Sequence, residues 1–125
     1  MKHWLLIAAV MGGIAVVLGA FAAHGLRTIL SERMLATFAT GAQYQMYHAL
    51  AIGLAGFAVR GRAARLANIA AALFLAGIAL FSGSLYALAL TGVTALGMIT
   101  PLGGLSLIAG WVLLGLAALK LDTAE

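Results

Sequence analysis

Four long apolar runs fill most of this 125-residue chain. Each run has about the 20 residues that a helix needs to cross the hydrocarbon core of a bilayer. Hydrophobic residues make up 65% of the sequence and charged residues only 8%, whereas soluble domains are about 45–50% apolar. We therefore expect one membrane domain, residues 1–125, with no room for a soluble catalytic domain.

The spacing of the apolar runs predicts an all-α fold, an integral membrane four-helix bundle. The predicted spans are residues 4–23, 42–59, 66–90 and 101–119. The first run follows Lys2 and His3, as a secretory signal would, but it exceeds the roughly 7 to 15 residues of a signal core. We interpret it as the first membrane helix.

The segment between the first two spans has an amphipathic pattern. Apolar residues recur every fourth position among charged ones, at Leu26, Leu30, Met34 and Phe38. Ser31 followed by Glu32 is typical of a helix N-cap with an acid in the first turn. We therefore predict an amphipathic interfacial segment between the first two helices, with a helix that begins near Glu32 and runs on into the second span.

The connection before the fourth span is uncharged. Residues 91–100 contain two glycines and are expected to form a short loop or a re-entrant turn. Thr100 and Pro101 are predicted to open the last helix as N-cap and first helical residue, because proline lacks only an N–H that would be unpaired there.

Basic residues indicate the orientation of the chain. Five of the seven fall at the ends expected on one side (Lys2, Arg60, Arg62, Arg65 and Lys120), and Arg27 and Arg33 fall on the other. The positive-inside rule then predicts a multi-pass protein of the inner (plasma) membrane with both termini cytoplasmic. Basic residues scattered in this way are topology signals, so no nucleic-acid partner is expected.

Polar residues within the spans gather toward the predicted outer half. The candidate ligand-binding residues are His24, Gln43, Tyr44, Gln45, Tyr47, His48, Ser82, Ser84 and Tyr86. Hydrocarbon penalises unpaired polar groups, so these side chains are expected to face the interior of the bundle or a ligand. On a helix, Tyr44, Gln45 and His48 share a face.

Several readings of this cluster stay open. The tyrosines and glutamines fit an interfacial belt, and His48 fits a neutral side chain bonded to a backbone carbonyl. His48 and Tyr44 also suit a quinone or a lipid headgroup. A weaker alternative pairs His24 with His48 as ligands of haem iron or another metal. The serines either bond across helices or bond to their own helix.

Enzymatic chemistry has little support in the sequence. There is no Cys, and the only acids are Glu32, Asp122 and Glu125. No Ser-His-Asp set can be assembled from them, because two of the three lie in the C-terminal tail, on the predicted inner side. We expect no enzyme, and the sequence identifies no cofactor.

Four motifs in order carry a family resemblance. They are residues 19–26 (GAFAAHGL), 44–50 (YQMYHAL), 81–86 (FSGSLY) and 99–104 (ITPLGG). Together they resemble the YgdD/YwdK-like family of small bacterial inner-membrane proteins, an uncharacterised domain with mitochondrial relatives in animals. The resemblance covers essentially the whole chain and implies a four-helix membrane protein without an assigned activity or cofactor.

The sequence therefore predicts a non-enzymatic membrane module. Its outer half would bind a small hydrophobic ligand, such as a lipid or quinone, or a membrane-protein partner. One alternative is an assembly subunit or homo-oligomer of a larger complex, docking through small-residue faces at Gly12, Gly19, Gly53, Gly56, Gly110 and Gly115. The other is a redox protein that carries haem or quinone at His24 and His48.

Overall fold

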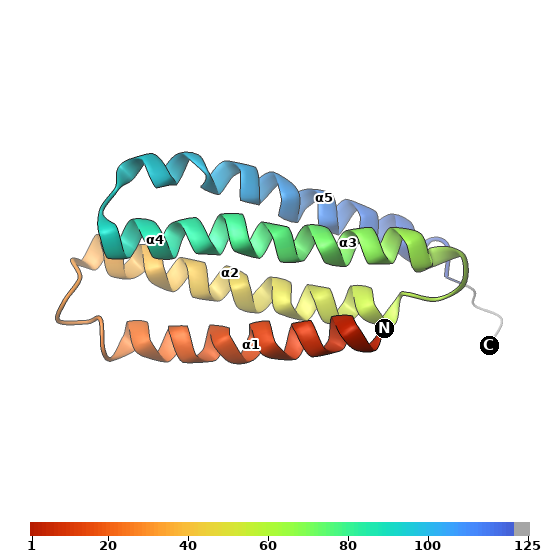
Figure 1. Cartoon of the computed structure of the whole chain (residues 1–125), viewed down its shortest axis with the longest axis horizontal. Helices are drawn as coiled ribbons and strands as arrows, with labels where there is room; N and C mark the ends of the chain where they lie inside the picture. The colour runs from red at the N-terminus through yellow and green to blue at the C-terminus, as the bar shows by residue number, and fades with distance from the viewer. Residues whose placement is uncertain (122–125) are drawn as a thin grey trace.

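Four helical rods lie side by side in the computed structural model, which describes residues 1–121 (Figure 1). The first rod is α1 (Lys2–Ala23) and the second is α2 (Glu32–Phe57). The third rod joins the 3₁₀ turn η1 (Gly61–Ala63), α3 (Ala64–Gly77), the π-helical turn η2 (Ile78–Ser82) and α4 (Gly83–Thr91), and the fourth is η3 (Thr94–Met98) followed by α5 (Thr100–Ala118). The predicted all-α four-helix membrane fold is confirmed.

The rods pack in a fixed order. α1 packs mainly on α2, α2 also contacts α3 and α4, and α5 packs on α3 and η2. The main core cluster lies where α2, the third rod and α5 meet, around Ile52, Phe74 and Leu107. α1 is the most peripheral rod, because few of its residues are buried.

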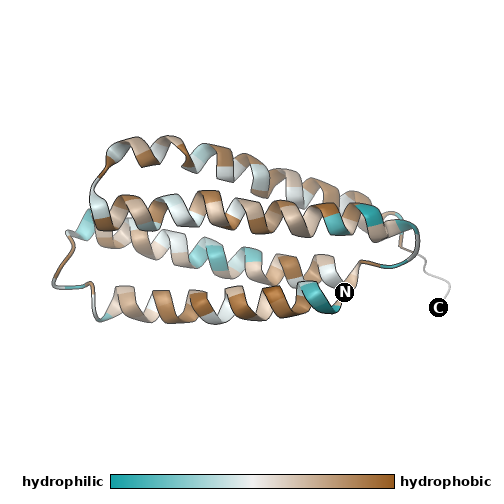
Figure 2. Cartoon of the chain, in the orientation of Figure 1, coloured by the Kyte–Doolittle hydropathy of each residue, from teal (hydrophilic) through white to brown (hydrophobic). Residues whose placement is uncertain are grey.

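Three of the rods are long and apolar enough to cross a membrane, namely Lys2–Ala23, Gly61–Thr91 and Thr94–Ala118. α2 is not among them, because polar side chains interrupt its sequence. Figure 2 shows that hydrophilic residues concentrate at the two ends of the bundle and in one stretch near the middle of α2. That stretch contains several of the candidate site residues.

The start of α2 agrees with the predicted cap. The Ser31 hydroxyl accepts a hydrogen bond from the Met34 amide, and Glu32 lies in the first turn. The helix then runs unbroken to Phe57, and Phe38, only 1% exposed, already packs against Phe21 and Tyr86. Residues 43–48 consequently lie near the middle of a 26-residue helix, deeper in the bundle than a span that starts at residue 42 implies.

The start of α5 differs from the prediction. Thr100 is not the N-cap; that position belongs to Ile99, and Pro101 lies in the first turn as expected. The Thr100 hydroxyl instead lies 2.6 Å from the Ser84 hydroxyl, so it joins α5 to α4. The connection before it contains η3, preceded by Gly92 in the left-handed conformation (φ 72°) that ends α4.

The third and fourth rods approach each other most closely at the π-turn. A Cβ atom on Gly103 would overlap the backbone of Phe81, so only glycine fits at this position. Gly83, between the two serines of the FSGSLY motif, faces open space. This close contact fixes the position of Phe81 where the two rods meet.

Candidate functional site

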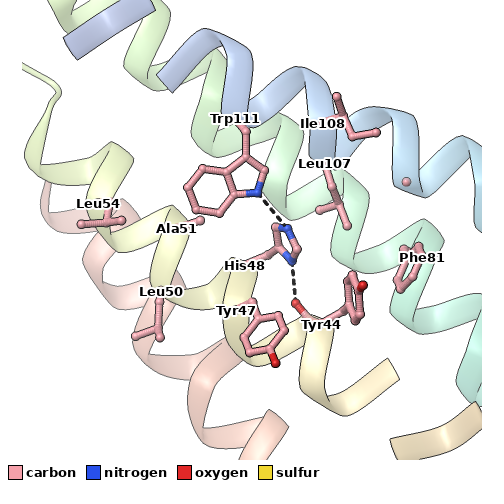
Figure 3. Close-up of a pocket in the computed structure, with 11 residues that line it drawn as sticks. Tyr44, Tyr47, His48, Leu50, Ala51, Leu54, Phe81, Leu107, Ile108 and Trp111 are labelled. Carbon is pink, nitrogen blue, oxygen red and sulfur yellow. Dashed lines mark hydrogen bonds between the residues drawn. The ribbon is translucent and has the colours of Figure 1, made fainter. Parts of the chain in front are cut away.

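A groove of about 770 Å³ lies between α2 and α5. α2 contributes Tyr44, Tyr47 and His48 to its lining, η2 contributes Phe81, and α5 contributes Trp111 (Figure 3). The remaining lining residues are Leu50, Ala51, Leu54, Gly104, Leu107 and Ile108. Apart from His48 and the tyrosine hydroxyls, the lining side chains are apolar, as is common for pockets that take small hydrophobic molecules.

His48 joins the two walls of the groove. Its Nε2 accepts a hydrogen bond from the Trp111 indole N–H at 3.1 Å, and its Nδ1 lies 2.7 Å from the Tyr44 carbonyl oxygen. An indole N–H can only donate, so Nε2 carries no proton and Nδ1 carries the proton that it donates to the carbonyl. The imidazole is thus a neutral ring with both nitrogens bonded inside the protein (Figure 3).

Aromatic rings surround this histidine. The Tyr44 ring lies 4.8 Å from the Phe81 ring, and the Trp111 ring lies 5.1 Å from the Phe74 ring. His48 packs against Phe74 and Trp111 with ring centroids 5.8 and 5.9 Å away. These separations are typical of favourable aromatic pairs, which hold a rigid wall in place.

Two lining residues, Tyr44 and Tyr47, carry hydroxyls with no partner in the described structure. Neither the Tyr44 nor the Tyr47 hydroxyl makes a hydrogen bond to any of residues 1–121. Both side chains are more than one third exposed. They are the polar groups of the lining with hydrogen-bonding capacity to spare.

A second group of predicted residues serves the packing of the bundle. Gln45 accepts a hydrogen bond from the Tyr86 hydroxyl at 2.7 Å and donates through Nε2 to the Met11 carbonyl at 2.9 Å. The Ser82 hydroxyl donates across helices to the Gly41 carbonyl at 2.7 Å. These bonds tie α2 to α1 and to the third rod, within the bundle rather than in the groove.

Ser84 makes both kinds of contact that the sequence analysis considered for the serines. Its hydroxyl bonds to the Phe81 carbonyl within its own rod and to the Thr100 hydroxyl on α5. Ser106 similarly donates from α5 to the Leu73 carbonyl on the third rod at 2.8 Å. Hydroxyls therefore add interhelical bonds at several levels of the bundle.

The other two predicted site residues lie elsewhere. His24 is exposed at the C-terminal end of α1, whereas His48 is buried against the third rod and α5. Gln43 is exposed and lines a shallower hollow with α1 residues. The structure thus brings Tyr44, Tyr47 and His48 together in the groove and places the remaining candidates outside it. Within residues 1–121, no three His, Cys, Asp or Glu side chains cluster as a metal site would require.

Sequence reasoning missed the α5 wall of the groove. Gly104, Leu107, Ile108 and Trp111 recur at spacings of three and four, which places them on one helical face. A tryptophan in the middle of an apolar run was the available signal, because its N–H needs a partner in hydrocarbon. Its partner, 63 residues earlier in the chain, was not evident from the sequence.

Most of the glycines considered as docking seams are used within the bundle. A Cβ on Gly56 would press on Trp4, and one on Gly110 would press on Phe74. Gly12 and Gly53 also face neighbouring helices, at ordinary van der Waals distance, whereas Gly19 and Gly115 face open space. The glycines therefore mainly serve helix packing in this chain.

Comparison with known proteins places the chain among membrane proteins. A family model described as a protein of unknown function (DUF423) matches residues 18–104. The UPF0382 membrane protein YwdK of Bacillus subtilis is 42% identical over 122 residues, which cover 96% of this chain and 98% of that protein. The UPF0382 inner membrane protein YgdD of Escherichia coli is 38% identical over 120 residues, covering 96% and 92% of the two chains. These matches confirm the family resemblance. No solved structure matches the chain.

Proposed function

Because the chain belongs to the DUF423 family and is related to the UPF0382 membrane proteins, we propose that it binds a ring-bearing hydrophobic lipid in the groove between α2 and α5. The ligand class is a lipid quinone or a similar molecule, with a flat ring that carries oxygen atoms and an apolar tail. The proposal assigns binding, not catalysis, to the groove.

The membrane arrangement that goes with this function has four spans in the plasma membrane and cytoplasmic termini. α2 crosses as well, because its polar side chains Gln45 and His48 are buried and bonded within the bundle. We place its outer boundary near Leu35, one turn into the helix, since Phe38 is already buried there. His48 is then about 20 Å below that boundary at 1.5 Å per residue, which is past the middle of a hydrocarbon core about 30 Å thick rather than in the outer half that the sequence predicted.

The groove's two unbonded hydroxyls beside aromatic rings carry the proposal. A flat ring can stack among Tyr44, Phe81 and Trp111, since aromatic faces attract planar ligands. The hydroxyls of Tyr44 and Tyr47 can donate to its oxygen atoms, which have no water to bond with at this depth. The apolar tail can follow the Leu50 and Leu54 side of the groove toward the acyl chains.

His48 has a positioning role in this proposal. Both of its nitrogens are bonded, so it fixes Trp111 on one wall and leaves recognition of the ligand to the tyrosines. The same bonding disfavours metal coordination, because a metal ion would have to displace the Trp111 N–H or the Tyr44 carbonyl.

Tryptophan fluorescence provides the test, because the chain has only two tryptophans, Trp4 and Trp111. The Trp4→Phe protein in nanodiscs keeps the groove tryptophan as the sole reporter. Adding a benzoquinone with a short isoprenoid tail should quench its fluorescence along a saturable curve. The Trp111→Phe protein should show only the weak, linear quenching of a probe that collides within the bilayer. Equal and linear quenching of both proteins would overturn the proposal.

Two glycine substitutions on α5 test the location. Gly104→Leu should abolish the saturable quenching, because a Cβ at this position enters the groove without a clash and the larger side chain fills it. Gly115→Leu is the matched control, since it faces open space outside the groove. Replacing the two tyrosines with phenylalanine should weaken the probe's affinity about tenfold, as two lost hydrogen bonds of modest strength imply.

A further inference from the structure

A second groove, of about 490 Å³, lies between α1 and α3, away from the α2–α5 groove. Its walls are apolar: Trp4 and Met11 on α1, and Ala72, Leu75, Ala76 and Ala79 on the third rod. Both helices contact α2, and the groove lies between them.

One hydrogen bond closes the groove at the end of the bundle where the chain begins. The Trp4 indole N–H donates to the Asn68 side-chain oxygen at 2.8 Å. The Asn68 amide nitrogen bonds to none of residues 1–121, so its two N–H groups remain free to donate. A tryptophan and an amide at a helix end are typical of the headgroup region of a bilayer.

Arg65 lies one turn before Asn68 on the same face of α3. Its side chain is exposed and makes no hydrogen bond or ion pair with any of residues 1–121. The face that starts at Arg65 and Asn68 continues through Ala72, Ala76 and Ala79 along the groove. A cation, a free amide and an apolar channel therefore follow one another along one helix.

Charge is distributed unequally between the two ends of the bundle. Five basic residues lie at the end of the bundle that carries Arg65: Lys2, Arg60, Arg62, Arg65 itself and Lys120. Among residues 1–121 the one acid is Glu32, which starts α2 at the opposite end. This end is therefore complementary to a negatively charged headgroup.

We propose that the groove between α1 and α3 binds an anionic phospholipid. One acyl chain lies between Trp4, Leu75 and Ala76, and the phosphate accepts hydrogen bonds from the Arg65 guanidinium and the Asn68 amide. The distance along the third rod from Asn68 to Ala79 is about 16.5 Å at 1.5 Å per residue. That length matches about half of the 30 Å hydrocarbon core, which is the depth of one leaflet.

Native mass spectrometry of the full-length protein tests this lipid site. The protein is equilibrated with equal amounts of dioleoyl phosphatidylglycerol and dioleoyl phosphatidylcholine, which share acyl chains and differ in headgroup charge. We expect one phosphatidylglycerol molecule to be retained about tenfold more often than phosphatidylcholine, the ratio that one charge-assisted contact supplies. Equal retention of the two lipids would overturn the proposal.

Two variants with matched controls test the location. Arg65→Gln should remove the preference for phosphatidylglycerol, whereas Arg33→Gln at the other end should keep it. Ala76→Phe should block the channel and lower retention, whereas Ala20→Phe, at an exposed position on α1, should not. Circular dichroism of every variant verifies that the bundle is folded.

Each remaining outcome contradicts the lipid site. If Arg33→Gln reduced the preference for phosphatidylglycerol as much as Arg65→Gln, the protein would attract anionic lipid generally and not at this groove. If Arg65→Gln removed the preference but Ala76→Phe left lipid retention unchanged, no acyl chain would occupy the groove. The test is independent of the quinone proposal, because Ala76→Phe leaves the α2–α5 groove and its tryptophan reporter unchanged.

Discussion

Trp111 on α5 donates its indole N–H to Nε2 of His48 on α2, across 63 residues of sequence. The bond joins two helices that otherwise face each other across an open groove. It fixes the tautomer of His48 and the orientation of Trp111, so it connects one residue of each wall.

Loss of His48 should destabilise the folded bundle without preventing its insertion. His48→Ala makes α2 more apolar, so insertion is expected to proceed at least as readily. The Trp111 N–H loses its acceptor, and the free energy of unfolding should fall by about 1 to 3 kcal/mol. Unfolding in sodium dodecyl sulfate, followed by circular dichroism, measures this change.

A double-mutant cycle with Trp111→Phe isolates the bond itself. The two substitutions should be non-additive by about 0.6 to 2 kcal/mol, the range for interhelical hydrogen bonds in membranes. Additive effects would show that the two side chains stabilise the bundle separately.

Gln45 should matter more for stability than its partner Tyr86. Gln45→Leu removes two interhelical bonds, one to the Met11 carbonyl and one from the Tyr86 hydroxyl. Tyr86→Phe removes only the second. We expect Gln45→Leu to cost about 1 to 3 kcal/mol and Tyr86→Phe roughly half as much. The same unfolding assay compares them, and an equal loss would mean that the bond to α1 contributes nothing.

Alanine should destabilise the bundle at Gly103 but not at the adjacent Gly104 on α5. Gly103→Ala forces a Cβ into the Phe81 backbone and should destabilise the bundle by about 3 kcal/mol or more. At Gly104 the nearest atom to a Cβ is 3.9 Å away, on the Phe81 ring, so Gly104→Ala should be neutral or slightly stabilising. Thermal unfolding of the pair measures the difference. Similar melting temperatures would contradict the close approach at the π-turn.

The basic connection after α2 should control orientation. Replacing Arg60, Arg62 and Arg65 with glutamine leaves too few charges to distinguish the two sides, so a mixed orientation is expected. Reporter fusions at both termini measure it. Arg27→Gln with Arg33→Gln is the control and should keep both termini cytoplasmic, whereas a fixed orientation in the triple variant would assign the signal to Lys2 and Lys120.

Local signals in the sequence predicted local structure well. Ser31 and Glu32 were identified as a helix start, and the structure has that cap. Thr100 also has a side chain suited to an N-cap. Its hydroxyl bonds to Ser84 instead, so α5 starts one residue earlier than predicted, with Ile99 at the N-cap position. A cap depends on near neighbours in sequence, so it can be predicted until a tertiary contact competes for the same hydroxyl.

The contacts between rods could not be predicted from the sequence. The shared face of Tyr44 and His48 follows from their spacing, and both line the groove. Nothing in the spacing reveals that Gln45, one residue later than Tyr44, turns to Met11 and Tyr86 instead. Periodicity assigns a side chain to a face, but which helix covers that face depends on packing between distant segments.

The glycine contacts between the third rod and α5 also restrict motion. Leu107 fits against Gly77, Phe81 against Gly103 and Phe74 against Gly110, so α5 cannot slide or rotate along its neighbour without steric overlap. Gly41 on α2 admits the Tyr86 ring of the third rod in the same way, so α2, the third rod and α5 are held in one register.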